Sequence, residues 1–474
     1  MEMNMKNMTL KNIAAVCGGA YIGAKEDSGR EITGAVIDSR LVKPGNLFIP
    51  IKGAKVDGHD FIPAVFEKGA LAVLSEHELD NPAGAYILVA SAEDAMKKLA
   101  AYYRRSLDIK VVGITGSVGK TSTKEMIASV LAQKYSVLKT EGNLNNEIGL
   151  PLTIFKIREE HEVAVLEMGI SEFGEMHRLA QMAQPDVCVI TNIGLCHLEN
   201  LITRDGILKA KTESFEHLAP EGIAVLNGDD DKLCEKKTVN GRPAVFYGIG
   251  KEAKSLETEN GRKQLAPKEG CARDSAADGL TGTKAVIHIG DESFAVHIPI
   301  AGEHNVYNAL AAAAVARQLG LSAEEMKRGI EAVQTIGGRS NLIEKNGITV
   351  IDDCYNANPV SMQASIDVLS GASGRRIAVL GDMGELGADE RELHAMVGRH
   401  FAGKEIDAVF VTGTLAAEIA KGVREVSPAT EVCEAKTKEE LISRLQQYQR
   451  CGDTILVKAS HFMGFAEIVK ALTV

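Results

Sequence analysis

The chain has 474 residues, of which 45% are hydrophobic and 25% are charged, and its formal net charge at pH 7 is −11. This composition is typical of a globular protein and excludes general disorder, while the length predicts more than one domain. The negative charge argues against nucleic acid or an anionic membrane as the main partner.

The cysteines and the N-terminus indicate the cellular compartment. The eight cysteines contain no CxxC pair and no zinc spacing, which predicts reduced and mostly buried thiols. The N-terminus lacks the pattern of a secretory signal, and no stretch approaches the roughly 18 apolar residues of a membrane helix. We therefore expect a cytoplasmic protein.

The first segment, residues 1–92, is predicted to be a small α/β domain. Short strands are expected in Ile32–Asp38, in NLFIPIKG at 46–53 and in ALAVLSE at 70–76. A helix from Ala92 to Arg105 should follow, because apolar residues recur on one of its faces. This helix leads into the second segment.

The second segment, residues 93–334, alternates strands with helices, which predicts a mostly parallel sheet covered by helices. Strands are expected at Ile109–Thr115, Val163–Met168, Val187–Asn192 and Ile223–Asn227, with a helix at Thr121–Lys134. The polar stretch from Lys251 to Thr283 is expected to be an exposed excursion, or a hairpin insertion, before the strand AVIHIG.

The third segment, residues 335–474, repeats this alternation. Strands are expected in ITVID, RRIAVLGD, AVFVTG and TILVKAS, each with a helix after it. The pattern is typical of a doubly wound, Rossmann-like sheet. The predicted fold class is therefore α/β in three domains: a small N-terminal α/β domain, a central P-loop ATPase-like parallel sheet and a C-terminal Rossmann-like domain.

The strongest local signal is TGSVGKTS, a glycine-rich turn between a strand and a helix. Glycines let the backbone aim its N–H groups at phosphate oxygens, and the helix N-terminus adds a favourable dipole. Lys120 can neutralise phosphate charge, and a hydroxyl at 121 or 122 can bind Mg²⁺. The strict motif has glycine where this chain has Ile114, so the loop is a shorter variant. We predict nucleotide binding by Thr115, Gly116, Ser117, Val118, Gly119, Lys120, Thr121 and Ser122.

Other residues indicate the kind of nucleotide enzyme. The chain contains no Asn-Lys dipeptide, the usual guanine-reading signal, so ATP is favoured. Glu167 ends a strand, where the acidic Mg²⁺ partner of a phosphate loop normally lies, although a solvated glutamate can occupy such a place. His197 follows another strand, and a lone histidine is usually structural. Lys211, if deprotonated, can add CO₂ and become a carbamate, an anionic oxygen donor.

Together these segments resemble the Mur ligases, the ATP-dependent amino-acid-adding enzymes of peptidoglycan synthesis. The resemblance covers nearly the whole chain through TGSVGKTS, the Glu167 strand, the His197-to-Lys211 spacing, GEHNVYNALAA at 302–312, Gly338-Arg339, DDCYNANPVS at 352–361 and VKAS. Three stretches resemble the members that add D-alanyl-D-alanine: GNLNNEIGLPLT at 142–153, DDCYNANPVSM and GDMGELG at 381–387. The N-terminal IDSRLVKPGNLFIPIKGAKVDGHDF is shared with the members that form the tripeptide.

The resemblance implies that ATP phosphorylates the carboxylate of a UDP-N-acetylmuramoyl-tripeptide and that the amine of D-alanyl-D-alanine attacks the acyl phosphate. It implies ATP and Mg²⁺ as cofactors, those two substrates as partners, no nucleic acid, no membrane insertion and a monomer. The implied catalytic residues are Lys120, His197, Lys211 and Arg339. The implied metal ligands are Thr121, Glu167, His197 and Lys211 as a carbamate.

The remaining implied contacts are with ATP and with the substrates. For ATP they are His304, Asn305, Asn308, Arg339 and Asp353. For the substrates they are Ser39, Arg40, Asn143, Asn145, Asn146, Tyr355, Asn358 and Lys458. A site split between the second and third domains should close on ATP about a hinge near Ile336–Arg339.

Structural alternatives stay open for several of these residues. Asn305 and Asn308 could cap a helix, Asp353 could solvate a turn, and Gly338-Arg339 could be a linker. Tyr355 and Asn358 could be packing and turn residues. Where the family has KGSR, this chain ends its last strand with Lys458, Ala459, Ser460 and His461, so a cationic fork is replaced by an imidazole. A tripeptide-forming ligase and a P-loop ATPase switch are the alternative functions.

Overall fold

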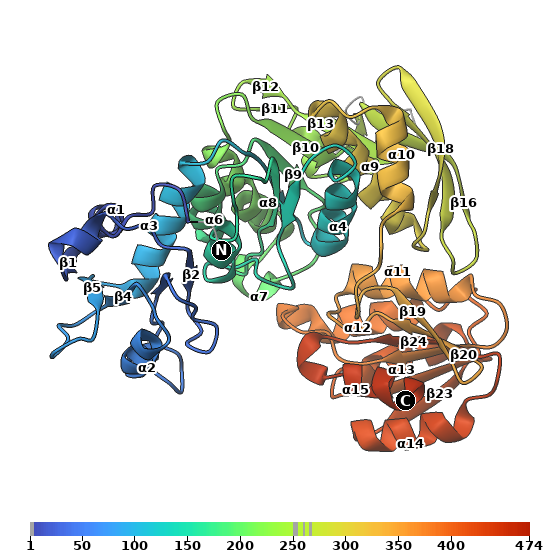
Figure 1. Ribbon diagram of the computed structural model, residues 1–474. Coiled ribbons are helices and arrows are strands. Elements are labelled where there is room, and N and C mark those ends of the chain that lie inside the picture. The colour runs from blue at the N-terminus through green and yellow to red at the C-terminus, as the bar shows by residue number, and fades with distance from the viewer. Residues whose placement is uncertain (1–3, 250–254, 259–260, 265–267) are drawn as a thin grey trace.

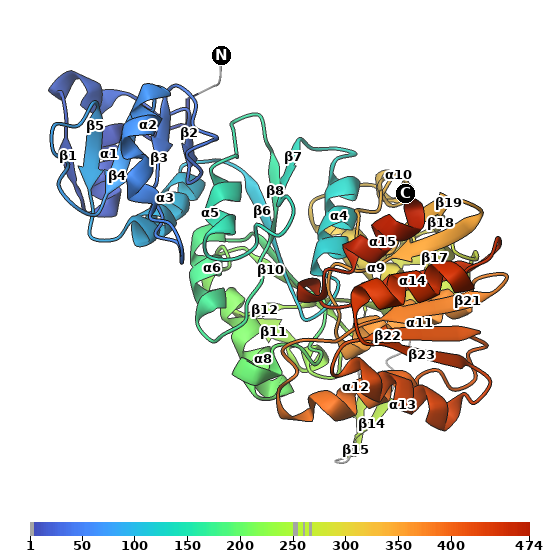
Figure 2. The same ribbon diagram turned by 90° about the horizontal axis from the view of Figure 1, so that it is seen from below.

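The protein is described by a computed structural model covering residues 4–249, 255–258, 261–264 and 268–474. Its three larger sheets follow one another along the chain, so the predicted α/β class with three units is confirmed. The central unit lies between the other two, as Figure 1 and Figure 2 show from two directions. We refer to these as the N-terminal, central and C-terminal units.

The N-terminal unit is built on a five-stranded sheet in the order β1-β5-β4-β3-β2. Strands β2 to β5 pair in parallel, and β1 runs antiparallel to β5. The expected strands are present but short, because only three or four residues of each pair with a neighbour. The elements are α1 (Leu10–Cys17), β1 (Ala20–Ile22), β2 (Gly34–Val36), β3 (Asn46–Phe48), α2 (Ile62–Glu67), β4 (Ala72–Ser75) and β5 (Ala85–Leu88).

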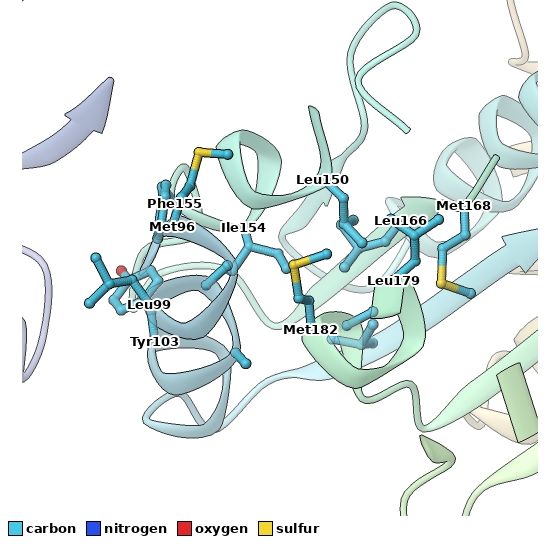
Figure 3. Packing of buried hydrophobic residues seen from close by; sticks show 14 of the residues in the cluster. Met96, Leu99, Tyr103, Leu150, Ile154, Phe155, Leu166, Met168, Leu179 and Met182 are labelled. Carbon is cyan, nitrogen blue, oxygen red and sulfur yellow. The ribbon is translucent and has the colours of Figure 1, made fainter. Parts of the chain in front are cut away.

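Helix α3 (Ala92–Arg105) joins the N-terminal unit to the central one, with the bounds that the sequence predicts. The Ser91 side chain caps it by accepting the Asp94 N–H at 3.1 Å. Its apolar face packs against α5 (Gly149–Ile154) and α6 (Glu175–Ala183), as Figure 3 shows. The buried Tyr103 hydroxyl donates to the Ile157 carbonyl at 2.6 Å. The contact therefore combines apolar burial with satisfied polar groups.

The central unit contains a nine-stranded sheet in the order β18-β17-β16-β13-β10-β9-β6-β8-β7. The pairs from β7 through β16 are parallel, and β17 and β18 extend the sheet antiparallel. The strands are β6 (Lys110–Thr115), β7 (Val137–Lys139), β8 (Val163–Glu167), β9 (Val187–Ile190), β10 (Ile223–Asn227), β13 (Val245–Ile249), β16 (Gly270–Ala277), β17 (Thr283–Ile289) and β18 (Glu292–Ile298).

The expectation of an exposed excursion at 251–283 is wrong for its last part. Strand β16 (Gly270–Ala277) lies inside the sheet, between β13 and β17. Cys271 and Ala272 are buried, but most of the other residues are small or polar, which hides the alternation expected of a strand. Strands β14 (Ser255–Thr258) and β15 (Gly261–Gln264) form the expected hairpin, and the rest of 250–267 lies outside the described residues.

Helices cover both faces of the central sheet, and the two longest that pack together are α4 and α9. The helices of the central unit, besides α5 and α6, are α4 (Lys120–Leu131), α7 (Leu198–Leu201), α8 (Arg204–Thr212), α9 (Glu303–Gln318) and α10 (Ala323–Glu331). The alanines of α9 are fully buried, and their small side chains let α9 approach both α4 and the sheet closely. Among the described residues, no helix combines the length and the apolarity needed to cross a bilayer.

The C-terminal unit has a six-stranded sheet in the order β19-β20-β24-β21-β22-β23. Helices α11, α12 and α13 bury one face of it and α14 and α15 the other, which confirms a doubly wound sheet. The hairpin partner β19 and the strand β23 were not predicted. The elements are β19 (Asn341–Lys345), β20 (Ile348–Asp352), α11 (Pro359–Ser370), β21 (Arg376–Leu380), α12 (Glu390–Arg399), β22 (Ala408–Thr412), α13 (Ala416–Val426), β23 (Glu431–Ala435), α14 (Lys438–Tyr448), β24 (Thr454–Lys458) and α15 (Ala466–Thr473).

Candidate active site

The predicted phosphate loop connects the end of β6 to the start of α4. Gly116 has φ +152° and Gly119 has φ +83°, a region that favours glycine. A Cβ atom on Gly116 would also stand 1.9 Å from the Thr191 hydroxyl oxygen. Gly119 is the N-cap of α4 and offers no side chain, so the first N–H groups of the helix face outward. The loop therefore has the geometry of an anion site.

Two polar residues after β9 hold this loop, and the sequence analysis missed both. The Asn192 amide accepts the Val118 N–H at 3.0 Å and donates to the Val118 carbonyl at 3.1 Å. The Thr191 hydroxyl donates to the same carbonyl at 2.6 Å. The signal in the sequence was a Thr-Asn pair directly after a strand, because β9 pairs in parallel with β6 and their carboxyl ends meet.

Lys120 and Thr121 begin helix α4 and contact different parts of the site. The Lys120 ammonium donates to the Gly116 carbonyl at 2.9 Å, so it lies over the loop where a phosphate would bind. The Thr121 hydroxyl donates to Oε1 of Glu167 at 3.1 Å. The structure thus brings together the two residues that were expected to share one Mg²⁺. Ser122 follows them on the same helix.

Glu167 is the last residue of β8, and its side chain is 2% exposed. Its Oε1 accepts from Thr121 and, at 2.8 Å, from the Asn145 amide. Its Oε2 is buried without a hydrogen-bond partner among the described residues, and the Lys124 ammonium is 3.9 Å away. A buried carboxylate oxygen without a partner is costly, so a divalent cation fits here.

Lys211 lies on α8 and is completely buried. Its amine has no hydrogen-bond partner in the part of the chain that the structure describes. Burial lowers its pKa to about 8; the nearby Cys196 opposes this shift, and the positive charge of Lys120 adds to it. A lysine that loses its proton this easily presents the neutral amine that reacts with CO₂, so the surroundings fit the carbamate hypothesis.

His197 is the N-cap of α7 and has φ +51°. Its Nδ1 is 2.6 Å from Oε2 of Glu385 in the C-terminal unit, but the two groups are not aligned as a hydrogen bond. The neighbouring His197 side chain lowers the pKa of Glu385, while partial burial opposes the shift. GDMGELG indicated only the family resemblance, and Glu385 was not predicted as a site residue. A carboxylate in a glycine-rich loop after a strand was the available signal.

The predicted ATP contacts of α9 lie at its first turns. The N-cap of α9 is Gly302, so neither asparagine caps the helix. The Asn308 amide oxygen accepts the Thr123 hydroxyl of α4 at 2.8 Å, and its NH₂ donates to Asn305 at 2.9 Å. The partly buried His304 ring has its Nε2 3.0 Å from the Asn305 amide nitrogen, and desolvation lowers the pKa of His304. These residues thus border the phosphate loop.

Asp353 and Lys458, which were expected to contact ATP and substrate, are bound to each other. The Lys458 ammonium is 2.6 Å from Oδ2 of Asp353, and its side chain is 3% exposed. The Ser365 hydroxyl donates to the same carboxylate oxygen at 2.6 Å. Both side chains are therefore engaged inside the C-terminal unit and present no free charged group in this conformation.

Arg339, Tyr355 and His461 form a stack at the edge of the C-terminal unit. The Arg339 guanidinium carbon lies 4.2 Å from the centre of the Tyr355 ring. The centres of the Tyr355 and His461 rings are 5.4 Å apart, and the two ring planes are tilted by 43°. Asn358 caps α11 by accepting the Ser361 N–H at 2.9 Å, which is the turn alternative left open for it. Tyr355 thus supports Arg339, and Asn358 has a structural role.

The predicted substrate residues outside the C-terminal unit fall into two separate groups. Ser39 and Arg40 follow β2 in the N-terminal unit, where the exposed Arg40 pairs with Asp38 at 2.7 Å. Asn143, Asn145 and Asn146 lie in the loop before α5. There the Asn146 side chain accepts the Gly149 N–H at 2.8 Å and the Asn145 amide reaches Glu167. Asn145 therefore lies on the cation side of the site.

Three family models match successive parts of the chain. They are "Mur ligase family, catalytic domain" at residues 31–111, "Mur ligase middle domain" at 114–316 and "Mur ligase, glutamate ligase domain" at 338–461. A UDP-N-acetylmuramoyl-tripeptide–D-alanyl-D-alanine ligase of Bacillus subtilis is 38% identical, with 99% of each chain covered. The chain belongs to the Mur ligase family.

Another relative and two solved structures are similar to this Mur ligase over most of its length. The enzyme of the same name from Escherichia coli is 33% identical, with 99% of each chain covered. A crystal structure of MurF from Acinetobacter baumannii superposes with a TM-score of 0.85 at 32% identity, covering 99% of both chains. A MurF ligase from Thermotoga maritima in complex with ADP gives a TM-score of 0.79 at 32% identity, covering 92% of this chain and 96% of that one.

Proposed function

We propose that this Mur ligase joins D-alanyl-D-alanine to UDP-N-acetylmuramoyl-tripeptide at the expense of ATP, a reaction of class EC 6.3.2.10. The observation that carries the proposal is the 38% identity over 99% of both chains with a relative that bears this name. The loop at 116–119, Glu167 and the buried Lys211 amine supply the local chemistry that such a reaction needs. A tripeptide-forming ligase and an ATPase switch remain as outcomes of the test.

In the proposed reaction the tripeptide carboxylate attacks the γ-phosphorus of ATP, and ADP leaves. The amine of D-alanyl-D-alanine then attacks the acyl carbon, the amine loses a proton, and phosphate leaves as the amide forms. Lys120 exchanges its bond to the Gly116 carbonyl for the γ-phosphate. Arg339, supported by the Tyr355 ring, brings a second positive charge from the C-terminal unit. Positioning and charge neutralisation are what this chemistry requires.

The proposal includes Mg²⁺. Thr121 and Glu167 would hold one ion, since Glu167 has an unpaired buried oxygen, and His197 with a carbamylated Lys211 would hold a second. When bound, Mg²⁺ neutralises phosphate charge during transfer. The adenine would lie near His304, Asn305 and Asn308, where α9 meets the phosphate loop.

The remaining parts of the proposal concern organisation and setting. The N-terminal unit (1–92) would bind the uridine nucleotide through Ser39 and Arg40, the central unit (93–334) would bind ATP, and the C-terminal unit (335–474) would close on both. The chain would act in the cytoplasm, because ATP and nucleotide-linked sugars are cytoplasmic substrates. It would act as a monomer.

The deciding experiment measures phosphate release with ATP, Mg²⁺ and UDP-N-acetylmuramoyl-tripeptide, with and without D-alanyl-D-alanine. Release that needs the dipeptide, together with a pentapeptide product by mass, supports the proposal. Release with a single amino acid and a dipeptide precursor would move the assignment to a tripeptide-forming ligase. Release that needs no acceptor would indicate the ATPase switch.

A further inference from the structure

Two imidazoles and a carboxylate meet on the surface of the central unit, on segments that belong to different helices. His177 lies on α6, and Glu216 and His217 lie on the 3₁₀ helix at Glu213–His217 that follows α8. His177 Nδ1 is 2.7 Å from Oε2 of Glu216 and 3.3 Å from Nε2 of His217. One donor atom from each residue lies within 4.8 Å of the others.

The two segments are already held in place by a fourth residue. The Glu213 carboxylate accepts the Gly174 N–H at 3.1 Å and the His177 N–H at 3.2 Å, at the start of α6. It therefore ties the backbone that carries His177 to the turn that carries Glu216 and His217. On the inner side, Met176 and Leu179 of α6 are fully buried. The backbone that carries the three side chains is thus held in place independently of the contacts between them.

We propose that His177, Glu216 and His217 form a binding site for a zinc-class transition-metal dication, separate from the site of the ligase reaction. Two imidazoles and one carboxylate are a ligand set that zinc accepts, whereas Mg²⁺ prefers oxygen ligands. Zinc–nitrogen bonds of about 2.0–2.1 Å in a tetrahedron put two ligand atoms about 3.3 Å apart. The two histidine nitrogens have that separation, whereas Nδ1 of His177 and Oε2 of Glu216, at 2.7 Å, are at hydrogen-bond distance and would move apart to bind the ion.

The remaining coordination position faces solvent, since the side chains of His177 and Glu216 are 44% and 58% exposed. A bound ion would clamp α6 to the turn after α8. Each of these segments continues toward the active site: Arg178 of α6 pairs with Glu147 in the loop beside Asn145 and Asn146, and α8 carries Lys211. The inference does not rest on the proposed ligase function, because it concerns a cation site outside the phosphate loop.

The test is a titration of the metal-free protein with Zn²⁺, followed by calorimetry, and with Co²⁺, followed by its visible absorption. A background carrying Cys451→Ser removes the exposed thiol as a competing ligand. We expect one tight equivalent with a tetrahedral Co²⁺ spectrum that a large excess of Mg²⁺ does not displace. His177→Ala and His217→Ala should each weaken binding by at least about tenfold, and Glu216→Gln should weaken it while keeping the shape of the side chain.

The matched control is His400→Ala, which removes a partly exposed histidine that pairs with Asp367 at 2.9 Å, and it should leave the titration unchanged. Circular dichroism and a nucleotide-binding measurement would show that each variant is folded. Equal affinity and stoichiometry in the unaltered protein and in both alanine variants would overturn the proposal. Displacement of Zn²⁺ by millimolar Mg²⁺ would overturn it as well. Neither readout uses turnover, so a failure of the ligase assignment would be seen separately.

Discussion

The side chains of His197 and Glu385 meet across the boundary between the central and C-terminal units, with Nδ1 and Oε2 2.6 Å apart. Both residues have a left-handed backbone, with φ values of +51° and +61°. Lys120 of the phosphate loop also lowers the pKa of Glu385 through its charge. One carboxylate from the C-terminal unit thus faces both the loop and the histidine that were predicted to handle phosphate.

The first prediction concerns closure of the C-terminal unit on ATP. Glu385→Gln removes the charge but keeps the shape, and we expect the decrease in radius of gyration on adding an ATP analogue with both substrates to become smaller. Because the side chain is 60% exposed, the pair should contribute no more than about 1 kcal/mol, so kcat should fall about three- to sixfold. Glu392→Gln, an exposed carboxylate paired with Arg399, is the control. Identical scattering from both variants would show that Glu385 does not couple to closure.

The second prediction concerns the carbamate. Lys211→Ala removes the buried amine, and we expect most of the activity to be lost, with partial rescue by bicarbonate or a short carboxylate that occupies the vacated space. The measurement is dipeptide-dependent phosphate release, with mass spectrometry of the unaltered protein at high bicarbonate as a check for the added CO₂. Full activity of the variant without any additive would rule out a carbamate role.

The third prediction concerns stability against pH. Burial lowers the pKa of Lys211 to about 8 from 10.5, so between these values the unfolded chain binds a proton that the folded chain does not. Folding is therefore penalised below about pH 8, by roughly 3 kcal/mol, and the penalty is relieved as the pH rises from 8 toward 10.5. In CO₂-free buffer, Lys211→Met should be more stable than the unaltered protein at pH 7, with a difference that shrinks by pH 10. A constant difference in urea unfolding would contradict this.

The fourth prediction concerns the phosphate loop. Gly116→Ala would place a methyl group 1.9 Å from the Thr191 hydroxyl oxygen at φ +152°, so we expect loss of ATP binding and a destabilisation of about 1–3 kcal/mol. Adding Thr191→Ala relieves the clash but not the backbone strain and should restore only part of the stability. Gly29→Ala, at an open position without a positive φ, is the control. Nucleotide titration and thermal unfolding measure both effects.

The fifth prediction concerns Arg339, which lies 4.2 Å from the Tyr355 ring. Lysine has no planar guanidinium that could stack on the ring or donate two parallel hydrogen bonds to phosphate. Arg339→Lys should therefore lower kcat by about a hundredfold. Tyr355→Phe keeps the ring and should cost much less. Full activity of Arg339→Lys would show that a positive charge is sufficient at this position and that the planar guanidinium is not needed. Single-turnover phosphoryl transfer is the measurement.

The sequence predicted the elements whose patterns are local. Helix α3 and strands β10 and β20 have the predicted bounds, because the spacing of their apolar residues is visible within each segment itself. Strands β16, β19 and β23 were missed or misplaced. Their residues are small, polar or half-exposed, and they form strands because of neighbours far away in the chain.

The candidate site shows the same division. The pairing of Thr121 with Glu167 followed from the loop motif and the end of a parallel strand. The contact of His197 with Glu385 could not be predicted, because it joins two units whose relative placement no local pattern specifies. Nor could the burial of Lys458 against Asp353, since either side chain alone would suit a ligand contact.

The strand order of the C-terminal sheet also bears on how the chain matures during synthesis. Strand β24 (Thr454–Lys458) lies between β20 and β21, yet it follows the other five strands of this sheet in the sequence. The five-stranded N-terminal sheet and the nine-stranded central sheet use only earlier residues, so each can assemble while the chain is still being translated. The C-terminal sheet has a gap until β24 has left the ribosome. Lys458, the partner of Asp353, arrives only then, so a nascent chain can form its phosphate loop before its C-terminal sheet is complete.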